Sequence, residues 1–143
     1  MKKNYRWEWH FKSEPVHVRG VVSDILQYLD ETLPQQTQEE RGELRLIFSE
    51  LLYNAVLHGN ASDNQKQVHI GLTVAGPLIC ACITDEGNGY NYQKTIAQLN
   101  EACDLYREKG RGLQLVKALV DGMSFDREGR SVIFEKRIGQ VHG

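Results

Sequence analysis

The N-terminal part of the chain changes between two hydrophobic patterns, one with a period of two and one with helical spacing. Trp7, Trp9 and Phe11 alternate with polar residues and predict a strand. The Ser-Glu-Pro sequence at residues 13–15 is typical of a helix start, because proline is tolerated in the first helical turn. The helix predicted there has an apolar stripe formed by Val18, Val21, Val22, Ile25, Leu26 and Leu29.

A second helix is predicted after the loop at residues 33–36. Thr37 and Glu40 have the spacing of a capping box, in which each side chain accepts a hydrogen bond from the other residue's backbone N–H. We expect this helix to end near His58 and Gly59, with the glycine as its stop. Its apolar face consists of Leu44, Ile47, Phe48, Leu51, Leu52, Ala55 and Val56.

The C-terminal half predicts two hairpins with a helix between them. Alternation over residues 68–74 and a nearly continuous apolar run at 78–83 flank a turn, so the second strand is expected to be central and buried on both faces. Residues 90–109 have weaker periodicity and are expected to form a mobile loop with a helix. A last helix is marked by Leu113, Val116, Leu119 and Val120, and a closing hairpin by residues 123–125 and 131–134.

These elements predict one domain over residues 1–143 with an α+β two-layer sandwich fold. The sheet is expected to be mixed but mainly antiparallel, with the helices on one face. The hydrophobic share of 41% and the charged share of 25% fit a globular domain of this kind.

Charge and cysteine content exclude several function classes. The net charge of −2 argues against a nucleic-acid binder, which usually has a basic excess. No run of about 18 apolar residues is present, so we expect neither a membrane span nor a membrane partner. The N-terminus also lacks the apolar region of a signal peptide. The three cysteines, an odd number, are expected to be reduced thiols, which indicates a cytoplasmic location; they are Cys80, Cys82 and Cys103.

The second predicted helix carries two residues suited to phosphoryl chemistry. Glu50 and Asn54 are four positions apart, so they share a helical face, and His58 continues the same row. We expect this face to lie opposite the apolar stripe. An amide oxygen can bind Mg²⁺, and a carboxylate one turn away can accept a proton from an attacking hydroxyl. The alternative is an ordinary solvated helix face.

Asp85 follows a buried apolar run, at the point where the predicted central strand ends. A carboxylate there needs a partner, because an unpaired buried charge is costly. The exocyclic amino group of adenine is such a partner, whereas guanine presents an oxygen at that place. Gly87 and Gly89 remove side chains where the backbone turns tightly or approaches a ligand. The alternative is a plain Asp-rich turn.

The sequence Gly110-Arg111-Gly112-Leu113 is predicted to open the last helix. Backbone N–H groups at a helix start favour anions, and two glycines would allow phosphate oxygens to come close. Arg111 would add a charged contact to phosphate or to a protein partner. The alternative is a simple helix-entry loop.

In this order, the three segments resemble the conserved boxes of the GHKL ATPase superfamily. The N-box is matched by residues 50–55 with His58-Gly59, the adenine box by residues 85–89, and the last glycine box by residues 110–113. The stand-alone length and the C-terminal run from residue 110 resemble the anti-sigma-factor serine-protein kinase branch. The glycine box departs from the fuller pattern, since Glu108 and Lys109 stand where another glycine is usual.

The resemblance implies a Bergerat-type ATP site. It implies that Asn54 binds Mg²⁺, that Glu50 acts as general base or polarises the nucleophile, and that Asp85 reads the adenine amino group. Gly87, Gly89 and residues 110–113, with His58, would surround the nucleotide, and residues 90–109 would form the lid. The expected function is an ATP-dependent serine/threonine protein kinase that phosphorylates a STAS-type anti-anti-sigma protein and sequesters a sigma factor. A homodimer is also implied.

Three alternatives remain open at this point. The chain can be a GHKL switch that binds ATP and partners with little kinase activity, or that acts on a signalling module without a sigma factor. It can be the catalytic piece of a histidine-kinase system, although no dimerisation helix pair with a phospho-acceptor histidine is present. It can also be an interaction domain that binds no nucleotide.

Overall fold

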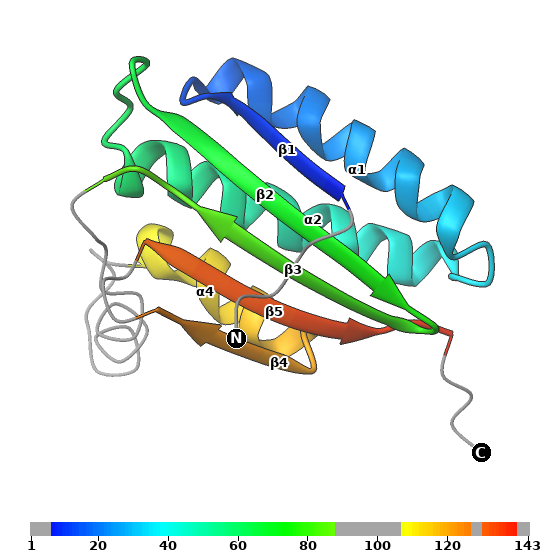
Figure 1. The fold of residues 1–143 in the computed structure, drawn as a ribbon. Helices are drawn as coiled ribbons and strands as arrows, with labels where there is room; N and C mark the ends of the chain where they lie inside the picture. The colour runs from blue at the N-terminus through cyan, green and yellow to red at the C-terminus, as the bar shows by residue number, and fades with distance from the viewer. Residues whose placement is uncertain (1–6, 88–106, 127–129, 140–143) are drawn as a thin grey trace.

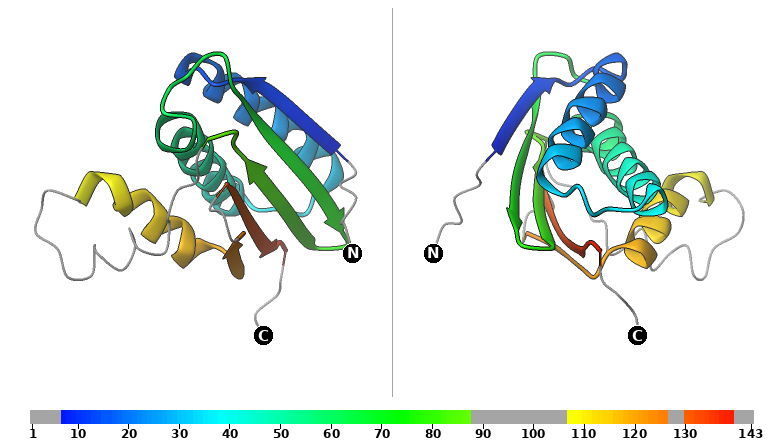
Figure 2. Two further views of the ribbon diagram at one scale, coloured as in Figure 1. Left: turned by 60° about the vertical axis from the view of Figure 1, so that its left-hand side comes forward. Right: turned by 90° about the vertical axis from the view of Figure 1, so that its right-hand side faces the viewer.

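The structure is a computed structural model that describes residues 7–87, 107–126 and 130–139. Its strands are β1 (Trp7–Lys12), β2 (Gln67–Ala75), β3 (Leu78–Thr84), β4 (Gly122–Phe125) and β5 (Ser131–Arg137). Its helices are η1 (Pro15–His17), α1 (Val18–Thr32), α2 (Gln38–Asn54), η2 (Ala55–Gly59) and α4 (Arg107–Leu119). The helices form one layer and the sheet forms the other (Figures 1 and 2).

The five strands form one sheet in the order β1-β2-β3-β5-β4. All four pairings are antiparallel, and the register places Ile83 opposite both Ile70 and Val132. The predicted central position of the second hairpin strand, β3, is therefore confirmed, as is the mainly antiparallel α+β sandwich. The expectation that β3 is buried on both faces is wrong, because Leu78, Cys82 and Thr84 on the face away from the core are only half-buried. Because β3 and β5 run in opposite directions, the end of β3 meets the start of β5.

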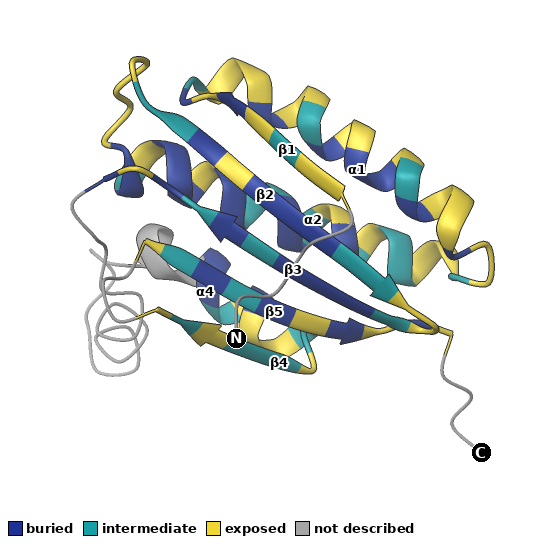
Figure 3. Cartoon of the chain, viewed as in Figure 1, coloured by how far each residue is buried: buried dark blue, intermediate teal, exposed yellow. Residues whose placement is uncertain are grey.

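The core lies between the sheet and the helices, and only one face of the sheet supplies it. Along β3, the side chains of Ile79, Ala81 and Ile83 face the helices and are buried. Helix α2 lies in the middle of the helical layer and contacts both α1 and α4. Helix α2 carries several buried segments, which are drawn dark in Figure 3.

The two helix starts follow their local sequence. Pro15 opens a short 3-10 helix, η1, and the α-helix begins only at Val18. The capping box of α2 is confirmed: Glu40 N–H donates to Thr37 Oγ1 at 3.0 Å, and Thr37 N–H donates to Glu40 Oε1 at 2.9 Å. These two bonds satisfy donors that the first helical turn leaves unpaired.

The turn between β2 and β3 agrees with the prediction, whereas of the two β3 cysteines expected to be buried, Cys80 is buried and Cys82 is half-buried. Gly76 has φ +58°, a conformation that glycine adopts without steric cost. Cys80 and Cys82 lie on the same face of β3, and neither forms a disulfide. Cys103 lies outside the described residues. Within the described part of the chain, no helix is both long and apolar enough to cross a membrane.

A buried ion pair joins the C-terminal end of α4 to α2. Lys136 on β5 is 7% exposed, and its Nζ donates to Glu43 Oε2 at 2.9 Å and to Leu119 O at 2.7 Å. The lysine thus pairs with a carboxylate of α2 and with the last carbonyl of α4 at the same time. This contact links α4 to α2 at the C-terminal end of α4, whereas the candidate site lies beside its N-terminal half.

Candidate nucleotide site

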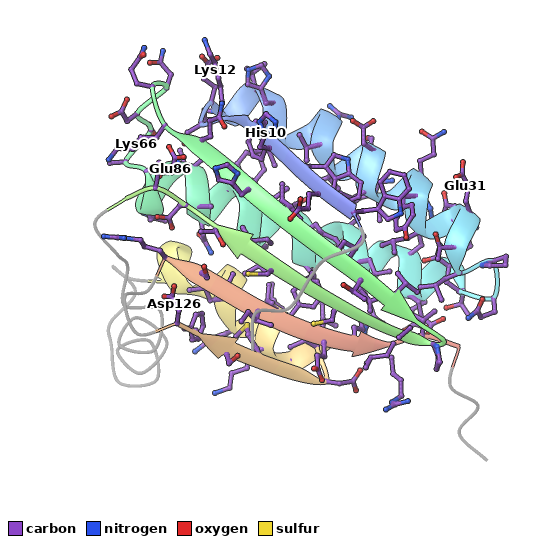
Figure 4. All side chains as sticks on the ribbon, viewed as in Figure 1. His10, Lys12, Glu31, Lys66, Glu86 and Asp126 are labelled. Carbon is purple, nitrogen blue, oxygen red and sulfur yellow. The ribbon has the colours of Figure 1, made fainter. Side chains whose placement is uncertain are left out.

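The candidate site lies where the end of α2, the end of β3 and the N-terminal half of α4 come together, at one end of the molecule (Figure 1). Lys66, Glu86 and Asp126 lie at this same end of the sheet in Figure 4. The antiparallel register explains the convergence, because β3 ends and β5 begins at this edge. Residues from all three predicted motifs are thereby brought to one region.

Asp85 is buried directly after β3 and is fixed through its backbone and one side-chain oxygen. It is 2% exposed, and its N–H donates to Arg130 O at 2.9 Å. The Oδ1 atom accepts from Gly87 N–H at 2.8 Å. The Oδ2 atom is buried and has no hydrogen-bond partner among the described residues. An acceptor held this way is available for a donor on a ligand.

Burial is the main cause that raises the pKa of the Asp85 carboxyl above its ordinary value of 3.8. The Gly87 N–H and the charges of Arg130 and Lys66 act in the opposite direction, while Asp126 adds to the increase. A ligand donor that paired with Oδ2 would favour the ionised form. In the free protein, burial thus disfavours the ionised form of Asp85, and a ligand amino group would stabilise that form.

Two glycines pack directly against Asp85. A Cβ atom at Gly59 would collide with Asp85 Oδ2, and a Cβ at Gly87 would collide with the carbonyl oxygen of Gly59. The close neighbour of Gly87 is therefore protein backbone, and its predicted approach to a ligand stays a prediction. For Gly59, the sequence predicted only a helix stop. Its contact with Asp85 joins the end of the second helix to the end of β3.

Asn60, which the sequence analysis did not single out, is the other buried polar residue at this junction. It is 0% exposed, its Nδ2 donates to Gln67 O at 3.0 Å, and its Oδ1 accepts from Glu86 N–H at 2.8 Å. Glu86 in turn accepts from Gln67 N–H at 3.0 Å and contacts His69 Nε2 at 3.2 Å. Its pKa is lowered, first by the Gln67 hydrogen bond and then by His69.

The second helix does not end as a regular α-helix. Its last residues, Ala55–Gly59, form a π-helical turn, and Asn60 N–H donates to Ala55 O at 2.8 Å. A π turn includes one more residue than an α turn and is often found at functional sites. Here it brings Gly59 against Asp85 and contains His58, which is half-buried.

Glu50 and Asn54 lie on α2 as predicted, and the alternative of an ordinary solvated helix face is wrong. Asn54 is only 8% exposed, and its Nδ2 is buried without a hydrogen-bond partner among the described residues. Glu50 is half-buried, and a Cβ at Gly112 of α4 would collide with its Oε2. The reason is that α4 covers the side of α2 that periodicity alone assigned to solvent.

The glycine-rich segment at residues 110–113 also lies differently from the prediction. Helix α4 begins at Arg107, so Gly110, Arg111, Gly112 and Leu113 are inside the helix and do not precede its first turn. Leu113 is buried in the core, and Gly112 is the close neighbour of Glu50. The N–H groups of an internal helical residue are used by the helix, so this conformation does not present them to an anion.

Some predicted site residues cannot be placed. Gly89 and the lid positions 90–106 lie outside the described residues, and only residues 107–109 of the predicted lid belong to a described element, α4. Among the described residues, no group of three or more His, Cys, Asp or Glu side chains is arranged to hold a metal. A magnesium ion that is held mainly by phosphate, water and one amide, that of Asn54, is compatible with this arrangement.

Comparison with known proteins decides the family. Residues 11–136 match the histidine kinase-like ATPase domain. The chain belongs to this family. An anti-sigma F factor of Bacillus licheniformis is 27% identical over 109 residues, covering 76% of this chain and 71% of the relative. An anti-sigma F factor of Clostridium perfringens is 28% identical over 149 aligned positions, covering 96% and 99%.

A third relative of this histidine kinase-like ATPase domain carries a kinase name. The serine-protein kinase RsbW of Staphylococcus aureus is 28% identical over 98 residues, covering 64% of this chain and 62% of the relative. The resemblance to the GHKL superfamily is confirmed, and the names of these relatives support its anti-sigma kinase branch. The role of each individual side chain stays a prediction.

Proposed function

We propose that this protein is an ATP-dependent serine/threonine protein kinase and anti-sigma factor. The names of its relatives, anti-sigma F factor and serine-protein kinase, support a sigma factor as one partner and serine as the phosphorylated residue. The substrate would be a STAS-type anti-anti-sigma protein, as the resemblance to the anti-sigma kinase branch implies. The observation that carries the proposal is the buried Asp85, whose Oδ2 has no partner among the described residues and lies against Gly59. That acceptor matches the amino group of adenine.

The roles of the individual residues follow from their placement. Asp85 would accept a hydrogen bond from the adenine amino group, with Gly59 and Gly87 allowing the close approach. Asn54, whose buried amide nitrogen has no hydrogen-bond partner among the described residues, would hold Mg²⁺ through its oxygen and donate to phosphate or water through its nitrogen. A bound Mg²⁺ would supply neutralisation of the phosphate charge.

Glu50 would accept the proton of the substrate hydroxyl. It lies one helical turn before Asn54 and next to Gly112, whose missing side chain leaves room for its carboxylate. His58, Gly89 and residues 110–113 would complete the nucleotide site, with Arg111 near phosphate or a protein partner. Because residues 110–113 are inside α4 in this conformation, we infer that the N-terminal turns of α4 rearrange when ATP binds.

The experiment that tests the proposal is transfer of labelled phosphate from ATP to candidate STAS-domain proteins of the same organism. The wild-type protein should label one serine or threonine. Glu50→Ala should still bind ATP but transfer phosphate about 10²–10⁴-fold more slowly, the usual effect of losing a general base. The matched control is Glu31→Ala, the same change at an exposed glutamate of α1 (Figure 4), which should transfer phosphate normally.

The outcomes separate the proposal from its alternatives. Tight ATP–Mg²⁺ binding without transfer to any STAS-domain protein would indicate a binding switch. Normal transfer by Glu50→Ala would contradict the base assignment. A wild-type protein that binds no ATP would refute the nucleotide site itself and favour an interaction domain.

A further inference from the structure

Asn60 occupies an unusual position beside the candidate adenine acceptor. It is fully buried, and both polar atoms of its side chain are hydrogen-bonded. Its backbone N–H is bonded as well, to Ala55 O in the π turn. A buried asparagine with every one of these groups paired is costly to replace, because each lost partner leaves a buried polar group unsatisfied.

The bonds of Asn60 connect three segments that are separate in the sequence. They link the π turn at residues 55–59, the start of β2 at Gln67, and the backbone immediately after Asp85. The Gln67 and Glu86 backbones are also joined through the Glu86 carboxylate, but that side chain is 45% exposed, so water competes for its bonds. The buried bonds of Asn60 are therefore the stronger link.

The peptide groups on both sides of Asp85 are held by different partners. On one side, Asp85 N–H donates to Arg130 O at 2.9 Å. On the other side, Glu86 N–H donates to Asn60 Oδ1 at 2.8 Å. These two bonds fix the Asp85 backbone, and Gly87 N–H fixes its side chain through Oδ1. The direction in which Oδ2 points thus depends on Asn60 through the Glu86 peptide group, in addition to the Gly87 N–H.

We propose that Asn60 is a positioning residue for nucleobase selection, which holds Asp85 against Gly59 so that Oδ2 stays unpaired and aimed at the 6-amino group of the base. The inference rests on the proposed ATP site and adds a residue that makes no contact with the nucleotide itself. Asn60 acts through the backbone of Glu86 and through the placement of Gly59, its own neighbour in the chain. Its contribution is selectivity between bases.

The test measures affinity for ATP and for purine riboside triphosphate, which lacks the 6-amino group, with the full chain. In the wild type, ATP should bind more tightly. In Asn60→Ala, we expect the preference for ATP to fall by about tenfold, the size expected when a well-placed hydrogen bond is lost. The ratio of the two affinities does not depend on the fraction of folded protein, so partial unfolding does not obscure the result.

Two controls separate selectivity from stability. Thr37→Ala removes a helix cap far from Asp85 and should lower stability without changing the ratio. Glu86→Ala removes only the exposed side-chain bonds and should change the ratio less than Asn60→Ala. Asn60→Ser keeps a shorter side chain that can still form a hydrogen bond, and it is the variant to measure if Asn60→Ala folds poorly. It should lower the affinity ratio less than Asn60→Ala does.

Each outcome decides one question. The inference would be overturned if both Asn60→Ala and Asn60→Ser lowered stability but kept the ATP-to-purine riboside triphosphate affinity ratio within twofold of the wild type. The proposed function would then remain intact. A wild type that binds ATP without preferring it over purine riboside triphosphate would overturn the inference together with the role of Asp85. A wild type that binds neither nucleotide would refute the proposed function itself.

Discussion

Asp85 and Gly59 form a contact that has no room for one additional carbon atom. The carboxylate oxygen of Asp85 lies where a side chain at position 59 would begin. Because Asp85 Oδ1 accepts from Gly87 N–H, and Arg130 O holds the Asp85 backbone, the carboxylate cannot rotate away without losing its bond to Gly87. Residue 59 is thus confined to glycine by its neighbour, although its own φ is not in the left-handed region.

Gly59→Ala should therefore weaken ATP binding by about 10–100-fold, the loss expected for one hydrogen bond to a charged group. Calorimetric titration with ATP–Mg²⁺ measures this effect. The matched control is Gly42→Ala, since a Cβ at that position of α2 meets no atom within 4 Å. It should leave ATP affinity unchanged and raise stability by about 0.5–1 kcal/mol. Equal ATP affinity in the two variants would refute the role of the contact.

At the scale of elements, the packing of α4 against α2 places Gly112 beside Glu50, the proposed general base. Gly112 lies against the Glu50 carboxylate, and Lys136 joins the other end of α4 to Glu43 of α2. Glu50 is therefore confined by a neighbouring helix. A long side chain such as glutamate is otherwise free to sample several rotamers, which would reduce the fraction in a productive orientation.

Gly112→Ala should slow phosphoryl transfer more than it reduces stability. The new Cβ would meet the far end of a flexible side chain, so Glu50 can move aside at low cost to the fold but leaves its position. In a Glu50→Ala background the same substitution should have little further effect on transfer, because the two residues act through one contact. Gly20→Ala in α1, with nothing within 4 Å of its Cβ, is the control. Additive losses in the double variant would contradict this coupling.

At the scale of the whole molecule, stability depends on pH through carboxyl groups whose pKa values are shifted in opposite directions. Burial raises the pKa of Asp85, so its contribution to stability is fully present below its unfolded pKa and is lost as pH rises through the folded pKa. Burial also acts to raise the pKa of Glu40, but hydrogen bonds from Thr37 and Gly139 outweigh it and lower that pKa. The contribution of Glu40 is lost as pH falls.

Asp85→Asn should therefore stabilise the nucleotide-free protein relative to the wild type near neutral pH, while severely weakening ATP binding. The advantage should shrink as pH falls towards the ordinary carboxyl range near 3.8, because the wild-type carboxyl becomes neutral there. Urea denaturation of both proteins at several pH values measures this difference, and the effect of Glu40 cancels between them. A stability difference that does not change with pH would refute the raised pKa of Asp85.

The sequence was sufficient to predict most of the elements but not their contacts. The capping box at Thr37 and the hairpin turn at Gly76 were predictable because their geometry is set by residues close in sequence. The burial of Asn54 was not predictable. An apolar stripe along a helix indicates one packed face, whereas α2 is covered by the sheet and by two helices. The contact of Gly59 with Asp85 joins positions 26 residues apart, and no local pattern encodes it.

The direction of β5 has a practical consequence for binding experiments. Ser131 lies opposite Thr84, and Arg137 lies opposite Leu78 at the far end of the sheet. With a rise of about 3.3 Å per residue, this strand carries the chain about 20 Å away from Asp85. A surface linker joined to the chain after β5 would therefore begin at the end remote from the nucleotide. Protein immobilised through such a linker would present its nucleotide end to the solution, where partner proteins can reach it.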